Sequence, residues 1–447
     1  MQKTAAFLMV SVLLLGLFLM RESRQGAGAR LETEYADWIA TNSSQTPEAA
    51  SPAHVAHITL VEINDSSLSS EHAWPWSPLE YAVFLRTALP FKPEVVAIEP
   101  ALNWKETRVR GSDAQKMEQY RAALREYILQ TPKLVLGAEL DTPEDEETVP
   151  PLQPAPLLPA RNIKGDKHRV PMFQEIAAQA EEDFRLSAST GFTNLPQDQG
   201  DIIHRAPLLF NYQGEIVPSF ALQTLMQWFK VTPDDVQVDL GSHIALGKAA
   251  TIPIDEEGTM EIDFGSRFAR VGEDDLMLAV SEQQEQPGQD AKARTSSATD
   301  AAKGATDALK GSIVLLARTD SGARTFTVPS LAKESRGEIC AAALATVLDR
   351  AYGRRAPAAF DFAVIAAMMA ASCFFHRFAK RAFALASFLG LLFYVFLCMS
   401  VQALWLVRLP FIVPLGLLLL VNFFSIFIER GTPGAPGPVA QAPAPRP

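Results

Sequence analysis

Acidic and aromatic residues lie at a few positions where they could bind a ligand. Asp65 and Glu99 each follow an apolar run, and a carboxylate at such a position can accept hydrogen bonds from a small molecule or hold a cation. Trp74 and Trp76 stand on either side of a proline and can stack on a flat ligand. A structural interpretation stays open for all four, because the carboxylates can cap turns and the tryptophans can pack in a core or cover a site as a lid.

Asp201 and Arg205 form a third candidate pair, which can either contact a ligand or make an ion pair within one turn. The sequence contains no P-loop, no nucleophile elbow, no paired cysteine ligands and no HExxH motif. We therefore expect ligand binding rather than enzymatic activity. We assign no catalytic residue, no metal site and no cofactor.

A strand, helix, strand segment positions the first of these residues. The β-branched run 58–63 predicts a strand that ends at Asn64-Asp65, a pair that favours a turn. Ser77-Pro78 predicts the start of a helix, since serine is a good N-cap and proline suits the first helical position. A second apolar run, 95–98, ends just before Glu99. Both acidic residues are then expected at the carboxyl edge of a parallel sheet, where α/β folds bind ligands.

Further elements follow along the chain, interrupted by two low-complexity inserts. Apolar patterning predicts strands at 133–138, 191–194, 206–210 and 313–317, short strands within 243–264, and helices at 113–129, from 218 and at 337–349. The inserts at about 141–161 and 281–310 are too polar or too rich in proline for core elements. We expect one α/β domain over residues 58–353, with a mixed sheet and flanking helices.

Four apolar segments indicate an integral membrane protein. They lie at residues 4–20, 358–375, 383–401 and 409–428, and each is about long enough for a bilayer. The basic sequence HRFAKR lies between the second and third segments, and the positive-inside rule places it in the cytoplasm. The prediction is a signal anchor at 1–20, with a cleaved signal peptide as the alternative, a lead-in and linker at 21–57, an extracytoplasmic segment over 21–357, three transmembrane helices within 358–428 and a cytoplasmic tail at 429–447.

Charge and cysteine content limit the partners of the part between these segments. All but three of the 51 acidic residues lie between residues 31 and 353, so binding to the phosphates of a nucleic acid is not expected. Cys340 is the single cysteine outside the apolar segments. This part therefore has no internal disulfide available and must be stabilised by its core.

The order of these motifs resembles that of the type 2 CHASE domain, an extracytoplasmic sensory domain of bacterial cyclases, histidine kinases and Ser/Thr kinases. The resemblance rests on the strand that ends at Asp65, on Trp74-Pro75-Trp76 before a helix, and on the strand that ends at Glu99. Later matching positions are Asp198, Asp201, Arg205, Pro207 and the PSFAL sequence at 218–222. The resemblance implies an N-terminal anchor, a sensor and three closing membrane helices.

Several polar positions depart from the family pattern. The chain has Ala317-Arg318 where glycine is expected, Arg324 where aspartate is expected and Cys340 where histidine is expected. These departures favour a scaffold, whereas the matching Asp65 and Asp201 favour a sensor. The residues after Arg430 are rich in proline, alanine and glycine, so we expect no output domain in the chain.

The leading hypothesis is a bacterial inner-membrane sensor that detects a small molecule, an ion or a state of the envelope outside the cytoplasm. It would pass the signal to a separate kinase or cyclase, and the resemblance implies a homodimer. The alternative is a membrane scaffold or structural envelope protein with a degenerate sensor fold that binds nothing.

Overall fold

The structure is a computed structural model of the chain. It describes residues 2–25, 28, 31–32, 35, 57–68, 74–104, 112–142, 153–196, 202–265, 268–277, 308–329, 332–352, 354–355, 358–374, 380–405 and 407–427. Most of the expected linker, the insert from 281 to 307 and the tail at 429–447 lie outside these residues. The chain divides into two compact units, one formed by residues 1–46 with 354–447 and the other by residues 47–353.

The second unit is built on a sheet of seven strands, all parallel except β6. In spatial order these are β15 (Ala269–Gly272), β1 (Ile58–Ile63), β16 (Ile313–Arg318), β2 (Val95–Ile98) and β3 (Leu134–Asp141), with β7 (Ser189–Phe192) and β6 (Glu175–Ala178) both paired to β3. β16, the last of these strands along the chain, lies between β1 and β2. The expected mixed sheet with flanking helices is confirmed.

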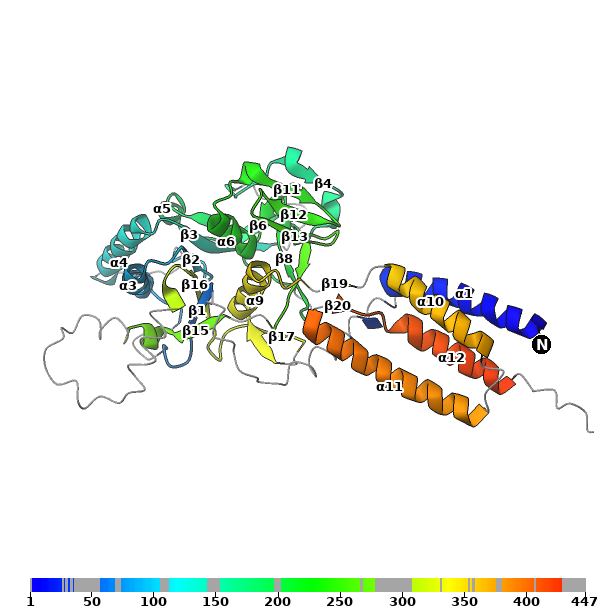
Figure 1. The fold of residues 1–447 in the computed structure, drawn as a ribbon. Helices are drawn as coiled ribbons and strands as arrows, with labels where there is room; N and C mark the ends of the chain where they lie inside the picture. The colour runs from blue at the N-terminus through cyan, green and yellow to red at the C-terminus, as the bar shows by residue number, and fades with distance from the viewer. Residues whose placement is uncertain are drawn as a thin grey trace, which may run out of the picture. The chain divides into compact units, whose positions relative to one another are not determined.

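Apolar side chains on both faces explain why this sheet is covered on both sides. Ile58 and Leu60 of β1 belong to one buried cluster, and Val61 and Ile63 belong to another. Helices α3 (Pro78–Ala88) and α4 (Ser112–Gln130) cover the second cluster, and α6 (Phe220–Phe229) and α9 (Arg336–Leu348) cover the first (Figure 1).

Serine side chains start the helices next to the sheet. The Ser77 side chain accepts a hydrogen bond from the Leu79 N–H at 3.3 Å, as the Ser77-Pro78 sequence predicts. Ser335 and Glu338 form a capping box at the start of α9, in which each side chain binds the backbone N–H of the other residue. The first turn of α9 is therefore held in one geometry.

Shorter strands and helices complete the second unit. They are β4 (Ile163–Lys164), β5 (Met172–Phe173), α5 (Glu182–Arg185), β8 (Arg205–Pro207), β9 (Leu209–Tyr212), β10 (Glu215–Pro218), β11 (Val236–Asp239), β12 (His243–Leu246), β13 (Ala250–Pro253), β14 (Thr259–Glu261), β17 (Thr325–Thr327) and β18 (Lys333–Ser335). The expected single strand at 206–210 is wrong, because the Leu208 N–H and C=O bind Gly258 and Ser219 and break it into β8 and β9. The expectation that the first insert adds nothing to the core is also wrong, since Leu158 is buried.

In the residues of the first unit that the structure describes, a helix lies at the position of each apolar segment. These helices are α1 (Gln2–Gln25), α10 (Ala358–Phe374), α11 (Lys380–Trp405) and α12 (Ile412–Phe427), with the short pair β19 (Arg354–Arg355) and β20 (Val407–Arg408). Val12, Ile365, Val413 and Leu417 form a buried contact between α1, α10 and α12.

Within the described residues, none of these helices has both the length and the apolar character that crossing a membrane requires. α10 has 17 residues and α12 has 16, whereas a span takes about 20. The prediction of four membrane-spanning helices is not confirmed.

Candidate functional site

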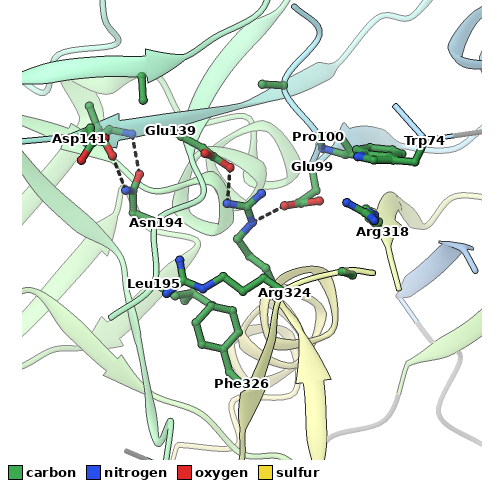
Figure 2. Close-up of a pocket in the computed structure, with 15 residues that line it drawn as sticks. Trp74, Glu99, Pro100, Glu139, Asp141, Asn194, Leu195, Arg318, Arg324 and Phe326 are labelled. Carbon is green, nitrogen blue, oxygen red and sulfur yellow. Dashed lines mark hydrogen bonds and ion pairs between the residues drawn. The ribbon is translucent and has the colours of Figure 1, made fainter. Parts of the chain in front are cut away.

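A pocket of about 500 Å³ opens at the carboxyl ends of β2, β3 and β16 (Figure 2). Acidic residues, arginines and aromatic rings line it together. This edge is where parallel α/β sheets bind ligands, because the connections that leave the strands diverge there. The pocket lies wholly within the second unit.

Arg336 joins two strand ends across the pocket. It is the first residue of α9, and its Nε and Nη1 atoms donate to Oε1 of Glu99 and Oε1 of Glu139. Glu99 is only 4 % exposed and directly follows β2, whereas Glu139 lies in β3. Burial by itself would lower the pKa of Arg336, but the two carboxylates outweigh it and raise the pKa. The guanidinium therefore stays charged and holds α9 to β2 and β3.

Arg318 and Trp74 form another part of the wall. Arg318 ends β16, and its Nη2 donates to Oδ2 of Asp320 at 2.9 Å while its Nε binds the other oxygen. The hydrogen bond from Arg318 lowers the pKa of Asp320. The guanidinium carbon also lies 4.6 Å from the ring centroid of Trp74, a cation–π contact that orients the indole against the pocket.

Arg324 differs from the other two arginines of the pocket. Its guanidinium carbon lies 5.2 Å from the ring centroid of Phe326, and Figure 2 shows its side chain reaching toward Leu195. In the part of the chain that the structure describes, no carboxylate forms an ion pair with it. Its charge is therefore available to a ligand.

Backbone packing fixes the acidic side of the pocket. Gly137 lies so close to β2 that a Cβ atom there would stand 2.0 Å from the Glu99 carbonyl oxygen. Asn194 binds both backbone groups of Leu140, accepting from its N–H and donating to its C=O, each at 2.8 Å. Glu139 and Asp141, on either side of Leu140, are thereby held in place.

Two of the residues expected from the sequence to bind a ligand line this pocket, Glu99 and Trp74. Trp76 does not, because it is buried against Tyr81 at a centroid distance of 5.5 Å, and its carbonyl accepts a hydrogen bond from the Trp104 indole. For Trp76 the core interpretation fits.

Asp65 and Arg205 also lie outside the pocket lining. The Asp65 carboxylate accepts hydrogen bonds from the backbone N–H and the hydroxyl of Ser321, both at 2.9 Å, and so ties the loop after β1 to the loop after β16. Arg205 forms its ion pair with Asp255. Asp201 lies outside the described residues. Ligand binding by these residues stays a prediction.

Five charged residues of the pocket were not among those candidates: Glu139, Asp141, Arg318, Arg324 and Arg336. β3 extends three residues beyond the expected strand end at 138, so the expected strand does not include Glu139 or Asp141. The positions of Arg318 and Arg324 are the departures from the family pattern, and that signal could have marked both arginines. Arg336 is 237 residues from Glu99, and no local pattern connects them.

A second charged cluster lies at the start of α9, where three carboxylates surround one guanidinium. Arg270 of β15 pairs with Glu62 of β1 at 3.1 Å and with Glu338 of α9. Burial raises the pKa of Glu62, and Arg270 offsets only part of this. Burial and then the charge of Glu338 raise the pKa of Glu334 in β18.

This cluster predicts a pH dependence of stability. A carboxyl group whose pKa is raised on folding binds more protons in the folded state, so stability increases as the pH falls toward the ordinary value of 4.5. Glu334→Gln, neutral at every pH, is expected to be more stable than the wild type at pH 7, with a difference that shrinks toward pH 5. Urea unfolding midpoints at pH 7, 6 and 5 measure this. The same pH profile in both proteins would contradict the assignment to Glu334.

Comparison with known proteins identifies the family of this chain. No curated protein and no solved structure matches the chain. The family model described as the CHASE2 domain matches residues 9–375, which is most of the chain. This protein therefore belongs to the CHASE2 domain family, whose domains are extracytoplasmic sensors.

Proposed function

We propose that this protein is an extracytoplasmic sensor that binds a small molecule in the pocket around Arg336 and reports the binding to a separate partner protein. The observation that carries the proposal is the pocket of about 500 Å³ at the carboxyl edge of the sheet. Its size falls within the range of small-molecule sites, and its charged side chains converge on one cavity. Membership of a sensory family supports the same function.

The position of Arg336 supplies a route for the signal. Arg336 is the first residue of α9, and α9 ends at Leu348, shortly before α10 begins at Ala358 in the sequence. A ligand charge placed next to Glu99 or Glu139 changes how strongly these carboxylates attract Arg336, and so how tightly the start of α9 is held. Signalling then requires the ligand to bind two arrangements of α9 with different affinity.

The proposal also attaches the protein to a membrane through the helices of the first unit. Large apolar side chains on these helices are exposed, including Leu14 at 63 %, Phe18 at 57 % and Phe393 at 67 %. Such apolar surface is unfavourable in water, and lipid or another apolar partner would cover it. The second unit would then lie on the periplasmic side and the C-terminus in the cytoplasm.

The proposed output is protein association rather than chemistry. The proposed partner is a separate kinase or cyclase, which would supply the enzymatic output. The proposed state of the sensor is a homodimer. The net charge of −11 makes nucleic acid an unfavourable partner.

A scaffold that binds no ligand is the second candidate function. It is favoured by the internal pairing of the pocket, since Arg336 already binds two carboxylates and Arg318 binds Asp320. Ion pairs that are complete without a ligand can serve the fold alone. The two functions differ in whether any molecule stabilises the protein.

The test is thermal unfolding of the full-length protein with fractionated small-molecule extracts of the bacterial envelope. A sensor is expected to gain several degrees in Tm with one fraction, because a ligand at 100 times its Kd contributes about 2.7 kcal/mol. Trp74→Ala in the pocket should lose this gain. Leu186→Ala, at an 80 % exposed residue outside the pocket lining, should keep it. If no fraction stabilises the wild type, the scaffold is the better explanation.

A further inference from the structure

The pocket is lined by charges of both signs. The carboxylates of Glu99, Glu139 and Asp141 come from the end of β2 and from β3. In Figure 2 Glu139 and Asp141 lie in the upper part of the pocket with Arg324 below them, and Arg318 lies beside Glu99. The pocket therefore presents charges of both signs, with Arg324 on the other side from Glu139 and Asp141.

Most of these charges neutralise one another. Arg336 is paired with Glu99 and Glu139, and Arg318 is paired with Asp320. These pairs leave no net positive charge that would attract an anion to either guanidinium.

One residue of each sign has no ion-pair partner, and the cluster of one guanidinium and two carboxylates around Arg336 keeps one further negative charge. Among the described residues, no carboxylate pairs with Arg324 and no cation pairs with Asp141. The Asp141 carboxylate accepts a hydrogen bond from the backbone N–H of Thr142 at 2.8 Å. Both residues are exposed and line the same cavity, so a ligand can reach them without breaking an existing ion pair.

We propose that the pocket binds a small zwitterion that carries one carboxylate and one ammonium group, as free amino acids and short peptides do. This inference rests on the proposed sensor function. The ligand carboxylate binds the guanidinium of Arg324, whose planar donors match a carboxylate. The ammonium group binds Asp141, with Glu139 beside it. Leu195 and Phe326, together with Trp74, also line the cavity and supply apolar surface to the ligand.

The arrangement disfavours ligands with a single charge. A simple anion on Arg324 would face the carboxylates of Glu139 and Asp141 across the cavity, and a simple cation on Asp141 would face Arg324. Only a ligand with both charges matches both sides, because each charge of the ligand then meets one of opposite sign.

The experiment measures the binding of defined probes to the full-length protein. The probes are the twenty common free amino acids and the dipeptide Ala-Ala, followed by tryptophan fluorescence and by Tm. The best probe is compared with its N-acetyl derivative, which lacks the ammonium charge, and with its carboxamide, which lacks the carboxylate. Arg324→Gln and Asp141→Asn are the pocket variants. Arg161→Gln is the matched control, since Arg161 is exposed and pairs with Asp234 outside the pocket lining.

At least one zwitterion is expected to bind, and each pocket variant is expected to raise its Kd roughly tenfold to hundredfold, because each removes a charge-assisted hydrogen bond. The acetylated and amidated derivatives should bind at least about tenfold more weakly than the parent probe. Arg161→Gln should leave the Kd within about twofold, as surface changes away from a site do.

Three results would overturn the inference: no zwitterion binds, both pocket variants bind as the wild type does, or the singly charged derivatives bind as tightly as the parent. Failure of the zwitterion inference can be distinguished from failure of the proposed sensor function. If an envelope fraction stabilises the wild type but not Trp74→Ala while none of the probes binds, the sensor stands and the zwitterion is wrong. If neither the fractions nor the probes bind, both fail.

Discussion

Replacing Arg336 with methionine is expected to lower the free energy of unfolding by about 3 to 5 kcal/mol, since removing one partner of a buried ion pair leaves the other charge uncompensated. Glu99 is 4 % exposed and has its ion pair with Arg336. Methionine keeps much of the length and apolar contact of the arginine stem. Urea unfolding of the full-length protein, followed by circular dichroism and tryptophan fluorescence, measures the change.

Two control variants distinguish the effect of leaving the buried Glu99 charge unpaired from a nonspecific loss of stability. Arg161→Gln breaks an exposed ion pair with Asp234 and is expected to cost at most about 1 kcal/mol. The double variant Glu99→Gln with Arg336→Met should recover part of the loss, because it removes the orphaned charge as well. A loss below about 1 kcal/mol in Arg336→Met would mean that Glu99 does not depend on this guanidinium.

The second large effect is expected at Gly137. Its added Cβ atom would stand 2.0 Å from the carbonyl oxygen and 2.8 Å from the carbonyl carbon of Glu99. Backbone atoms of a neighbouring strand cannot rotate away as a side chain can, so Gly137→Ala must push β3 away from β2. We expect a loss of about 3 kcal/mol, at the upper end of the range for overpacking, measured by the same unfolding experiment.

Gly137→Ala should also disturb the pocket, since Glu99 follows β2 and Glu139 lies in β3. Gly265→Ala is the matched control. The three atoms nearest to its added Cβ would all belong to the carboxylate of Asp263, the closest at 3.1 Å, and that side chain can move. We expect a change below about 1 kcal/mol there. Equal losses in the two variants would show that the approach of β3 to β2 is not the cause.

The sequence by itself determined the local elements and their order. Apolar β-branched runs predict β1, β2 and β16 because such runs suit buried parallel strands. Ser77-Pro78 predicts the start of α3 because its cap is a local hydrogen bond. The order of the motifs around Asp65, Trp74 and Glu99 indicates the family, and the match over residues 9–375 confirms it.

Only the tertiary structure decided which charged residues meet. β16 lies between β1 and β2, so Asp65 contacts Ser321 rather than sharing a pocket with Glu99. Parallel strands are joined by long crossovers, and their spatial order is therefore free of their order in the chain.

The site itself follows from that spatial order. Glu99, Glu139 and Arg336 lie on three elements far apart in sequence, and they form one ion-paired cluster because the carboxyl ends of β2 and β3 face the first turn of α9. Local propensity acts over a few residues, whereas an ion pair needs only proximity in space. The sequence could therefore name Glu99 as a candidate, but its partner was set by the packing of α9 on the sheet.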